Sequence, residues 1–167
     1  IKYHEEKGAD ITIMYNHEAK RDNDEVNKDQ RLTMDSTGRI AAIELDPYRP
    51  KTDCRSCDLM IMDKNLLEYL VEEAYSRGDM DFWRDVLMKR CDTLRMYGWE
   101  YNGVVMRIDS VSSYYDCSMK LLGESTWHGL LDRPVYTKQK DEFCTHYSKE
   151  ADVRDSIVAE GCNISGS

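Results

Sequence analysis

Short apolar segments alternate along this chain with amphipathic segments of ten or more residues, and this alternation constrains the fold more than any other feature. Residues 10–15 are β-branched and mostly apolar, as in a strand covered on both faces. Asp63 can cap a helix that follows the apolar strand 59–62, and Gly78 can end it. One face of that helix gathers its apolar residues, which are Leu66, Leu67, Leu70, Val71 and Ala74. The alternation predicts an α/β layered domain with a mainly parallel sheet.

A β-hairpin adds an antiparallel part to the predicted sheet. Residues 31–34 and 39–45 flank Asp-Ser-Thr-Gly at 35–38, which supplies local hydrogen bonds and a positive φ. Residues 16–31 before the hairpin are almost wholly polar or charged, which predicts a surface loop.

The other elements are predicted from caps and spacing. Residues 1–7 are expected to form the last turns of a helix that stops at Gly8. Residues 81–90 are expected to form a short helix, and residues 93–97 and 103–108 two strands. Ser110 caps a third helix. The stripe predicted to face the core on this helix comprises Val111, Tyr114, Tyr115, Met119 and Leu122.

The tail has a different pattern. Small and medium apolar residues are separated by polar ones from 151 to 166 without helical period. This is typical of the first turn of a parallel β-helix. The predicted organisation is therefore an α/β domain over 1–132, a linker over 133–150 and the start of the β-helix over 151–167.

Charge and hydropathy exclude two classes of partner. The chain has 23 Lys and Arg against 32 Asp and Glu, a formal charge of -9. A field of that sign repels phosphate backbones and anionic lipid, so we expect neither nucleic acid nor a membrane surface as partner. No run approaches the roughly 20 apolar residues of a membrane span, and the start lacks the pattern of a secretory signal. The expected location is the cytoplasm.

Six cysteines are spread along a chain that has enough apolar residues for a core, so we expect reduced thiols. Cys54 and Cys57 have the C-x-x-C spacing of half a zinc site. No second pair follows, and His17, His128 and His146 are far apart in sequence, so no metal site is predicted.

Four stretches together resemble the glucose-1-phosphate adenylyltransferase family, the pyrophosphorylases that make ADP-glucose. They are HEEKGADITI at 4–13, MDFWRDVL at 80–87, RIDSVSSY at 107–114 and VYTKQKDE at 135–142. Their order and separation also fit, and the Arg-Ile-Asp-Ser wording is most similar to the D-type subunit of bacterial glycogen synthesis.

This resemblance implies a fold and an assembly. The fold is the second half of a nucleotide-diphospho-sugar transferase-like, Rossmann-like mixed α/β sheet domain, followed by the first turn of a left-handed parallel β-helix. The family uses Mg²⁺ and a Gly-rich nucleotide loop in its first half, and no segment here resembles that loop, so no cofactor is expected in this chain. The implied partner is a catalytic C-type subunit in a hetero-oligomer.

The resemblance also locates the family's ligand positions, and several are substituted. Leu45-Asp46-Pro47 stands where catalytic relatives carry Glu-Lys-Pro, whose lysine holds the sugar phosphate. Arg107 replaces the aspartate that helps to hold magnesium, and Asp109 stands where relatives have glycine. Asp58 replaces the glycine of a Ser-Met-Gly sugar-pocket motif. The resemblance therefore implies a regulatory or structural subunit with impaired catalysis.

Each substitution also has a simpler interpretation. In this interpretation Asp46 is a turn residue before Pro47, Arg107 is a surface charge at a strand end, and Asp58 is a polar group beside a helix. The resemblance implies that Ser56, Asp81 and Asp85 are residual sugar-pocket positions, whereas the simpler interpretation of Asp81 and Asp85 is an N-capped helix start.

Two other functions compete with that of a regulatory subunit. One is an active nucleotidyltransferase for another sugar phosphate, with Asp81, Asp85 or Asp109 as Mg²⁺ ligands. The other is an effector-binding module whose candidate contacts are Arg133, Lys138 and Lys140, a cluster that is otherwise a solvated linker.

Overall fold

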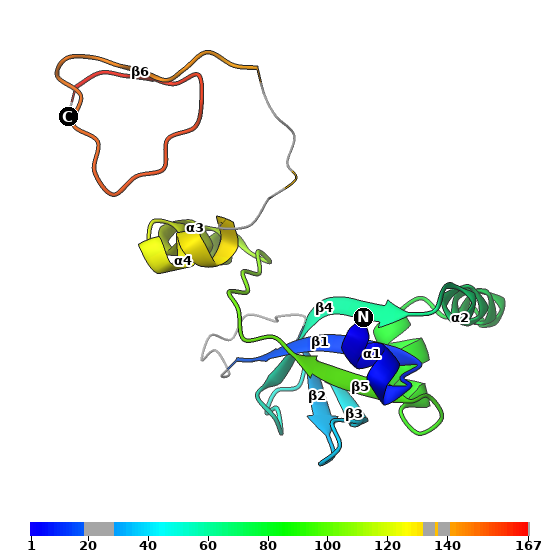
Figure 1. Ribbon diagram of the computed structural model, residues 1–167. Coiled ribbons are helices and arrows are strands. Elements are labelled where there is room, and N and C mark those ends of the chain that lie inside the picture. Colours follow the sequence, from blue (N-terminus) through cyan, green and yellow to red (C-terminus); the bar gives the residue numbers. More distant parts are fainter. Residues whose placement is uncertain (19–28, 132–135, 137–140, 167) are drawn as a thin grey trace. The chain divides into compact units, whose positions relative to one another are not determined.

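The computed structural model describes residues 1–18, 29–131, 136 and 141–166 (Figure 1). The chain divides into two compact units, Ile1–Val105 and Met106–Ser167, and each is described by itself. The predicted boundaries at 132/133 and 150/151 stay a prediction. Among the described residues, no helix combines the length and the apolar character needed to cross a bilayer.

A five-stranded mixed sheet forms the centre of the first unit. Its strands are β1 (Ile11–His17), β2 (Gln30–Met34), β3 (Ile40–Leu45), β4 (Cys54–Met62) and β5 (Met96–Glu100), in the order β3-β2-β4-β1-β5. Only the β1–β5 pairing is parallel among these strands; β1–β4, β2–β3 and β2–β4 are antiparallel. The prediction of a mainly parallel sheet was therefore wrong. Alternating strands and helices do not fix strand direction, and here β1 enters between β4 and β5 and runs against β4.

The hairpin prediction is confirmed. β2 and β3 pair from Gln30↔Leu45 to Met34↔Ile40. In the turn, the Asp35 carboxylate accepts hydrogen bonds from the backbone of Thr37 and Arg39, and Gly38 adopts φ 84°. The turn is fixed to β5, because the Gly98 N–H donates to the Gly38 carbonyl at 3.0 Å.

The N-terminal helix is also confirmed. α1 (Lys2–Lys7) ends at Gly8, which has the left-handed φ of 54°. Tyr3 on this helix donates its hydroxyl to the Gly98 carbonyl at 2.9 Å, and so α1 is fixed to β5. Figure 1 shows α1 beside β1 and β5.

The core of this unit lies between the sheet and the helical segments that follow β4. These are α2 (Lys64–Arg77), a π-helix η1 (Phe82–Leu87) and a 3₁₀ turn η2 (Met88–Arg90). Asp63 caps α2 and Gly78 ends it, as predicted. Only Leu70 of the predicted α2 face is fully buried, while Leu67 and Val71 are about half exposed. The fully buried apolar residues of this unit are Ile11, Ile13, Leu32, Ile40, Leu70, Val86, Leu87 and Met96.

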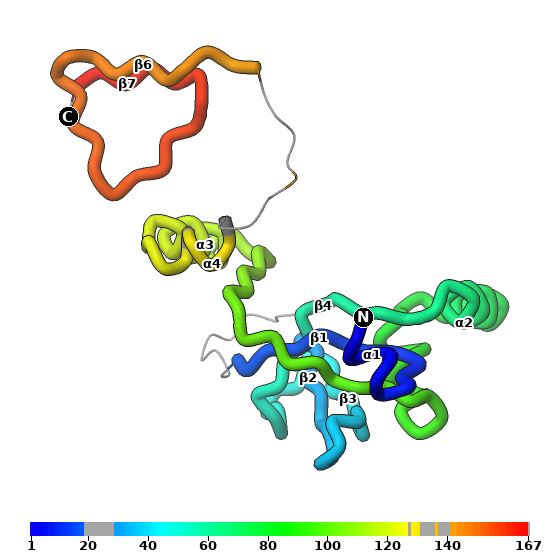
Figure 2. The backbone as a smooth tube through the Cα atoms, viewed as in Figure 1, coloured from blue at the N-terminus to red at the C-terminus, as the bar shows by residue number. Residues whose placement is uncertain are grey.

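The second unit contains α3 (Val111–Leu121), α4 (Glu124–Leu131), β6 (His146–Tyr147) and β7 (Asn163–Ile164). Ser110 caps α3, as predicted. Its side chain also forms a capping box with Ser113. The strand predicted over 103–108 does not form. The predicted inward stripe of α3 is largely exposed, and Ser113 and Cys117 are its buried residues instead. β6 and β7 are parallel and lie side by side in the closed loop of Figure 2.

Candidate functional site

Two buried arginines hold together the end of the sheet where β1 stops and β2 and β4 begin. Arg31 and Arg55 are register partners on β2 and β4, and each side chain is only 3% exposed. Arg31 lies 2.8 Å from the Asp29 carboxylate, and Arg55 lies 2.9 Å from the Glu18 carboxylate. Because buried charges are tolerated only when paired, these two carboxylates make the two cations compatible with burial.

Backbone carbonyls complete this arginine–carboxylate network. The Arg31 guanidinium donates to the carbonyls of Glu18 and Asp53, at 2.6 and 3.0 Å. Arg55 Nε lies 2.9 Å from an Asp29 oxygen without hydrogen-bond geometry. The cations are therefore used within the fold and do not project toward a ligand.

The predicted sugar-phosphate position, Asp46, closes the open end of the hairpin. Its N–H donates to the Asp29 carbonyl at 2.8 Å, and its carboxylate accepts from the Asp29 N–H at 2.7 Å. It is exposed and has φ 48°, a conformation that aspartate tolerates better than most residues. This geometry agrees with the turn interpretation.

Ser56 and Asp58 lie together in a bulge of β4. Opposite them on β1 the register jumps from Ile13↔Met60 to Tyr15↔Ser56. Asp58 is exposed with φ 55°, and its N–H donates to the hydroxyl of the fully buried Ser56 at 3.1 Å. The placement of Asp58 beside a helix was wrong, because β4 begins at Cys54 and is longer than the strand predicted over 59–62.

Asp81 and Asp85 are brought together by the start of η1. The Asp81 carboxylate accepts from the Arg84 N–H at 2.9 Å, which agrees with the N-cap interpretation. Asp85 accepts from the Asp81 N–H at 3.1 Å and lies 3.2 Å from the Lys89 ammonium. These interactions, the backbone hydrogen bond first, lower the pKa of Asp85 below its usual range.

Arg107 and Asp109 belong to the second unit, in the segment before α3. The Arg107 carbonyl accepts a weak hydrogen bond from the Cys117 thiol at 3.6 Å. The exposed Asp109 donates its N–H to the Ser113 hydroxyl at 3.0 Å. The interpretation of Arg107 as a strand-end charge was wrong, because residues 103–108 form no strand. Arg133, Lys138 and Lys140 lie outside the described residues.

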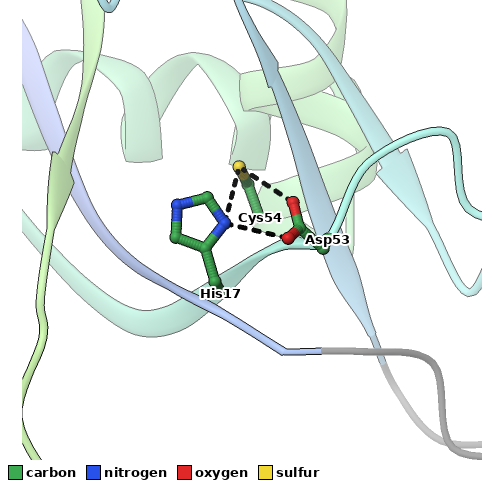
Figure 3. A group of neighbouring side chains, drawn as sticks. All are labelled: His17, Asp53 and Cys54. Atoms are coloured by element: carbon green, nitrogen blue, oxygen red, sulfur yellow. Dashed lines mark hydrogen bonds and ion pairs between the residues drawn. The ribbon is translucent and has the colours of Figure 1, made fainter.

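Sequence reasoning missed a cluster at the same end of the sheet, formed by His17, Asp53 and Cys54 (Figure 3). His17 Nδ1 lies 3.1 Å from Asp53 Oδ2 and 3.9 Å from Cys54 Sγ. His17 Nε2 faces Glu100 at 3.7 Å. The register His17↔Cys54 between β1 and β4 creates this cluster, and only that pairing could have revealed it.

The cluster is not arranged for nucleophilic catalysis. Burial raises the pKa of the Cys54 thiol, and the negative charges of Asp53 and Glu100 add to the shift. The hydrogen bond from His17 lowers the pKa of Asp53. A protonated thiol is a poor nucleophile, and both Cys54 and Asp53 share the same imidazole nitrogen. The ligand types present are instead those of a metal centre. All six cysteines carry free thiols, in agreement with the prediction.

A groove of about 330 Å³ lies on the other side of β1, beneath α1. Its lining is mostly apolar and includes Met14, Leu59 and Trp99. Among its polar groups, His4 and Thr12 are hydrogen-bonded to each other at 2.8 Å, and the Tyr3 hydroxyl donates to the Gly98 carbonyl at 2.9 Å. A sugar phosphate needs cations or free N–H groups, so this groove is unsuited to such a ligand.

Known proteins resemble this chain along most of its length, although no protein-family model matches it. It is 34% identical over 116 residues to the glycogen biosynthesis protein GlgD of Bacillus subtilis. The alignment covers 68% of this chain and 34% of that protein. It is 28% identical over 171 residues to the glucose-1-phosphate adenylyltransferase of Geobacillus stearothermophilus, covering 99% of this chain and 43% of the relative. The glucose-1-phosphate adenylyltransferase of Fervidobacterium nodosum is 25% identical over 171 residues. That alignment covers 100% of this chain and 40% of the relative.

These relatives and the mixed sheet define a class of nucleotidyltransferase-like α/β proteins. The chain belongs to the ADP-glucose pyrophosphorylase family. Within that family it is GlgD-like. It spans between 34% and 43% of the length of these relatives.

Proposed function

We propose that this chain is part of a D-type subunit of bacterial glycogen synthesis, which assembles with a catalytic C-type adenylyltransferase subunit. In this role it adjusts the partner's conversion of ATP and glucose-1-phosphate to ADP-glucose and pyrophosphate and contributes little catalysis itself. Support comes from the similarity to a glycogen biosynthesis protein, together with the substituted ligand positions. The cytoplasmic location expected from the sequence belongs to the same proposal.

The single observation that carries the proposal is the polarity at position 46. A carboxylate stands where the resemblance expects an ammonium to meet a phosphate dianion, and the reversal is worth several kcal/mol at an effective dielectric of about 20. The Asp46 carboxylate is also engaged by the Asp29 N–H at 2.7 Å. A phosphate ester at this position would meet repulsion and would disturb the closure of the hairpin.

The competing function, an active nucleotidyltransferase on another sugar phosphate, requires Asp81, Asp85 or Asp109 as Mg²⁺ ligands. Asp81 and Asp85 already accept backbone hydrogen bonds at the start of η1. These bonds disfavour a metal role for the pair.

The proposal also includes an assignment of the two units to known types of fold. We infer that the first unit contributes to the second half of a nucleotide-diphospho-sugar transferase-like domain and that residues 151–167 begin a left-handed β-helix after a linker over 133–150. His146 pairs in parallel with Asn163, 17 positions further on, as successive turns of a β-helix do. The effector role of Arg133, Lys138 and Lys140 remains a prediction.

The test is an activity assay with and without the partner. The protein is purified alone and together with a catalytic adenylyltransferase subunit from the same organism, and ADP-glucose formation from ATP, glucose-1-phosphate and Mg²⁺ is measured. We expect negligible turnover alone, stable co-purification, and a changed kcat or effector response of the partner. Robust turnover by the protein alone would exclude the proposal.

A second experiment examines position 46 directly by calorimetry with glucose-1-phosphate. Asp46→Lys should bind the ester more tightly than the wild type, while the matched Asp46→Asn variant keeps an oxygen acceptor for Asp29 and should not gain as much. Equal affinity of wild type and Asp46→Lys would show that the charge at this position does not control binding.

A further inference from the structure

We propose that His17, Asp53 and Cys54 form a binding site for a thiophilic divalent cation of the Zn²⁺ type. The ligands would be His17 Nδ1, a carboxylate oxygen of Asp53 and the Cys54 sulfur, with water in the fourth position. This site is independent of the proposed role in glycogen synthesis.

The three side chains lie close enough together to surround one tetrahedral ion. Zn²⁺ binds nitrogen and oxygen at about 2.0–2.2 Å and sulfur at about 2.3 Å, so ligand atoms around one ion lie about 3.3–3.8 Å apart. In the structure, Nδ1 of His17 lies 3.1 Å from Asp53 and 3.9 Å from Cys54. The other oxygen of the same carboxylate, Asp53 Oδ1, lies 3.8 Å from Cys54 Sγ. One ligand atom from each of the three residues lies within 4.8 Å of the other two, so a small rotation of the side chains would bring them around one ion (Figure 3).

The second imidazole nitrogen has the partner that a metal-bound histidine needs. His17 Nε2 faces the Glu100 carboxylate at 3.7 Å, from the end of the neighbouring strand β5. A carboxylate in this outer position orients the ring, so that Nε2 carries the proton and Nδ1 is left for the metal. The Tyr15 ring packs edge-on against the imidazole at 5.7 Å and limits its rotation.

The backbone that presents Asp53 and Cys54 is fixed on both sides. The Cys54 N–H donates to the Thr52 hydroxyl at 3.0 Å, and Arg31 donates to the Asp53 carbonyl at 3.0 Å. Arg31 is paired with Asp29, so its cation is neutralised beside the site. Three ligand groups, on β1 and at the start of β4, are therefore held in place before any ion arrives.

The chemistry of the ligand set selects the kind of ion. A thiolate with an imidazole and one carboxylate favours Zn²⁺ or Co²⁺ over Mg²⁺ and Ca²⁺, which prefer oxygen. Thiolate and carboxylate together supply two negative charges, which match a divalent ion. The side chains of His17 and Asp53 are 49% and 61% exposed, so the ion can enter from solvent while Cys54 forms the buried base.

The test is a Co²⁺ titration of the tag-free 167-residue chain, reduced and freed of metal by chelation. We expect one equivalent of Co²⁺ to produce a thiolate-to-cobalt charge-transfer band and the strong visible absorption of tetrahedral cobalt. Zn²⁺ should displace it and should raise the thermal unfolding midpoint, since a ligand that binds only the folded state stabilises it. Mg²⁺ should do neither. Absence of the charge-transfer band at excess Co²⁺ would overturn the proposal.

Variants assign the ligands. Cys54→Ser should abolish the thiolate band, while the matched control Cys57→Ser, the other half of the C-x-x-C pair, should retain it. His17→Gln changes a half-exposed side chain, so the fold should survive while binding is lost; circular dichroism checks this. Glu100→Ala should weaken binding about 10–100-fold and keep the band. A band that persists in Cys54→Ser, or disappears in Cys57→Ser, would overturn the assignment.

Discussion

Residues 1–105 enclose a core of fully buried large apolar side chains, whereas the described residues of 106–167 bury no large apolar side chain. In the first unit, Ile11, Ile13 and Leu32 are removed completely from water around the sheet. In the second unit, Val111 on α3 is 86% exposed, whereas the buried residues of that helix are the small Ser113 and Cys117. An apolar stripe at helical spacing therefore indicates which face would gain from being covered, and does not show that the same chain supplies the cover.

Charged side chains repeat this contrast. In the first unit, Arg31 and Arg55 are buried and share the carboxylates of Asp29 and Glu18. In the second unit, Arg154 pairs with Asp152 while 81% of its side chain stays exposed. The same kind of ion pair should therefore have very different effects on the stability of the two units, and matched variants measure the difference.

The largest effect is expected from Arg55→Met. It leaves Glu18 and Asp29 with carboxylates that are mostly buried and short of one cation, which typically costs about 3–5 kcal/mol. The matched Arg154→Met variant removes an exposed pair and should cost about 0–1 kcal/mol. Urea denaturation followed by circular dichroism measures both. Equal losses would remove the proposed contrast between buried and exposed pairs.

Leu32→Ala should have the next largest effect. Truncating a fully buried leucine leaves a cavity and should lower the free energy of unfolding by about 2–5 kcal/mol. Val111→Ala is the counterpart on α3, and its 86% exposure predicts a change within about 0.5 kcal/mol. Thermal unfolding of the two variants side by side is the measurement. A large loss in Val111→Ala would mean that the α3 stripe is covered in solution, for example by another subunit.

Removing a helix cap should lower stability by an intermediate amount, and the two caps should affect regions of different size. Asp63→Ala removes the acceptor for the Asn65 N–H and should cost about 0.5–2 kcal/mol of the stability of the first unit. Ser110→Ala removes the equivalent acceptor for Ser113 but should affect amide exchange in α3 alone. Hydrogen exchange resolved along the chain distinguishes a global change from a local one. Faster amide exchange in the first unit of Ser110→Ala would contradict this expectation.

The smallest effect concerns pH and the pair Asp10–Arg95. Hydrogen bonds from the Arg95 side chain, followed by its backbone N–H, lower the pKa of Asp10. The stabilisation is therefore complete above the ordinary carboxyl pKa of about 3.9 and is lost as pH falls through the lower, folded-state value. Because Arg95 is 60% exposed, we expect at most about 1 kcal/mol. Stability measured between neutral and strongly acidic pH should fall less steeply in Arg95→Leu than in the wild type.

Features set by neighbours in sequence could be predicted, and features set by strand pairing could not. Gly8, Asp63 and Ser110 were recognised as helix ends because a cap depends on a few adjacent residues. The turn at 35–38 was recognised for the same reason. Strand direction and the strand expected at 103–108 failed, because long-range pairing decides whether an apolar segment becomes a strand.

The candidate site follows the same division. The turn role of Asp46 and the cap role of Asp81 were among the interpretations available from sequence. The cluster of His17 with Cys54 was not, since 37 positions separate them and only the β1–β4 register brings them together. The long polar stretch between β1 and β2 also hid the partners of Arg31 and Arg55, because Glu18 and Asp29 lie at its two ends.

That last placement has a practical consequence for engineering. Glu18 and Asp29 are both anchored to Arg55, so one buried cation holds two positions that are eleven residues apart in the sequence. The entropy lost when a chain segment is held at both ends grows only slowly with its length, so an insertion between two such anchors should add little to that cost. An epitope or fluorescent reporter inserted between them is therefore expected to leave the sheet intact, giving a handle for following the protein in cells.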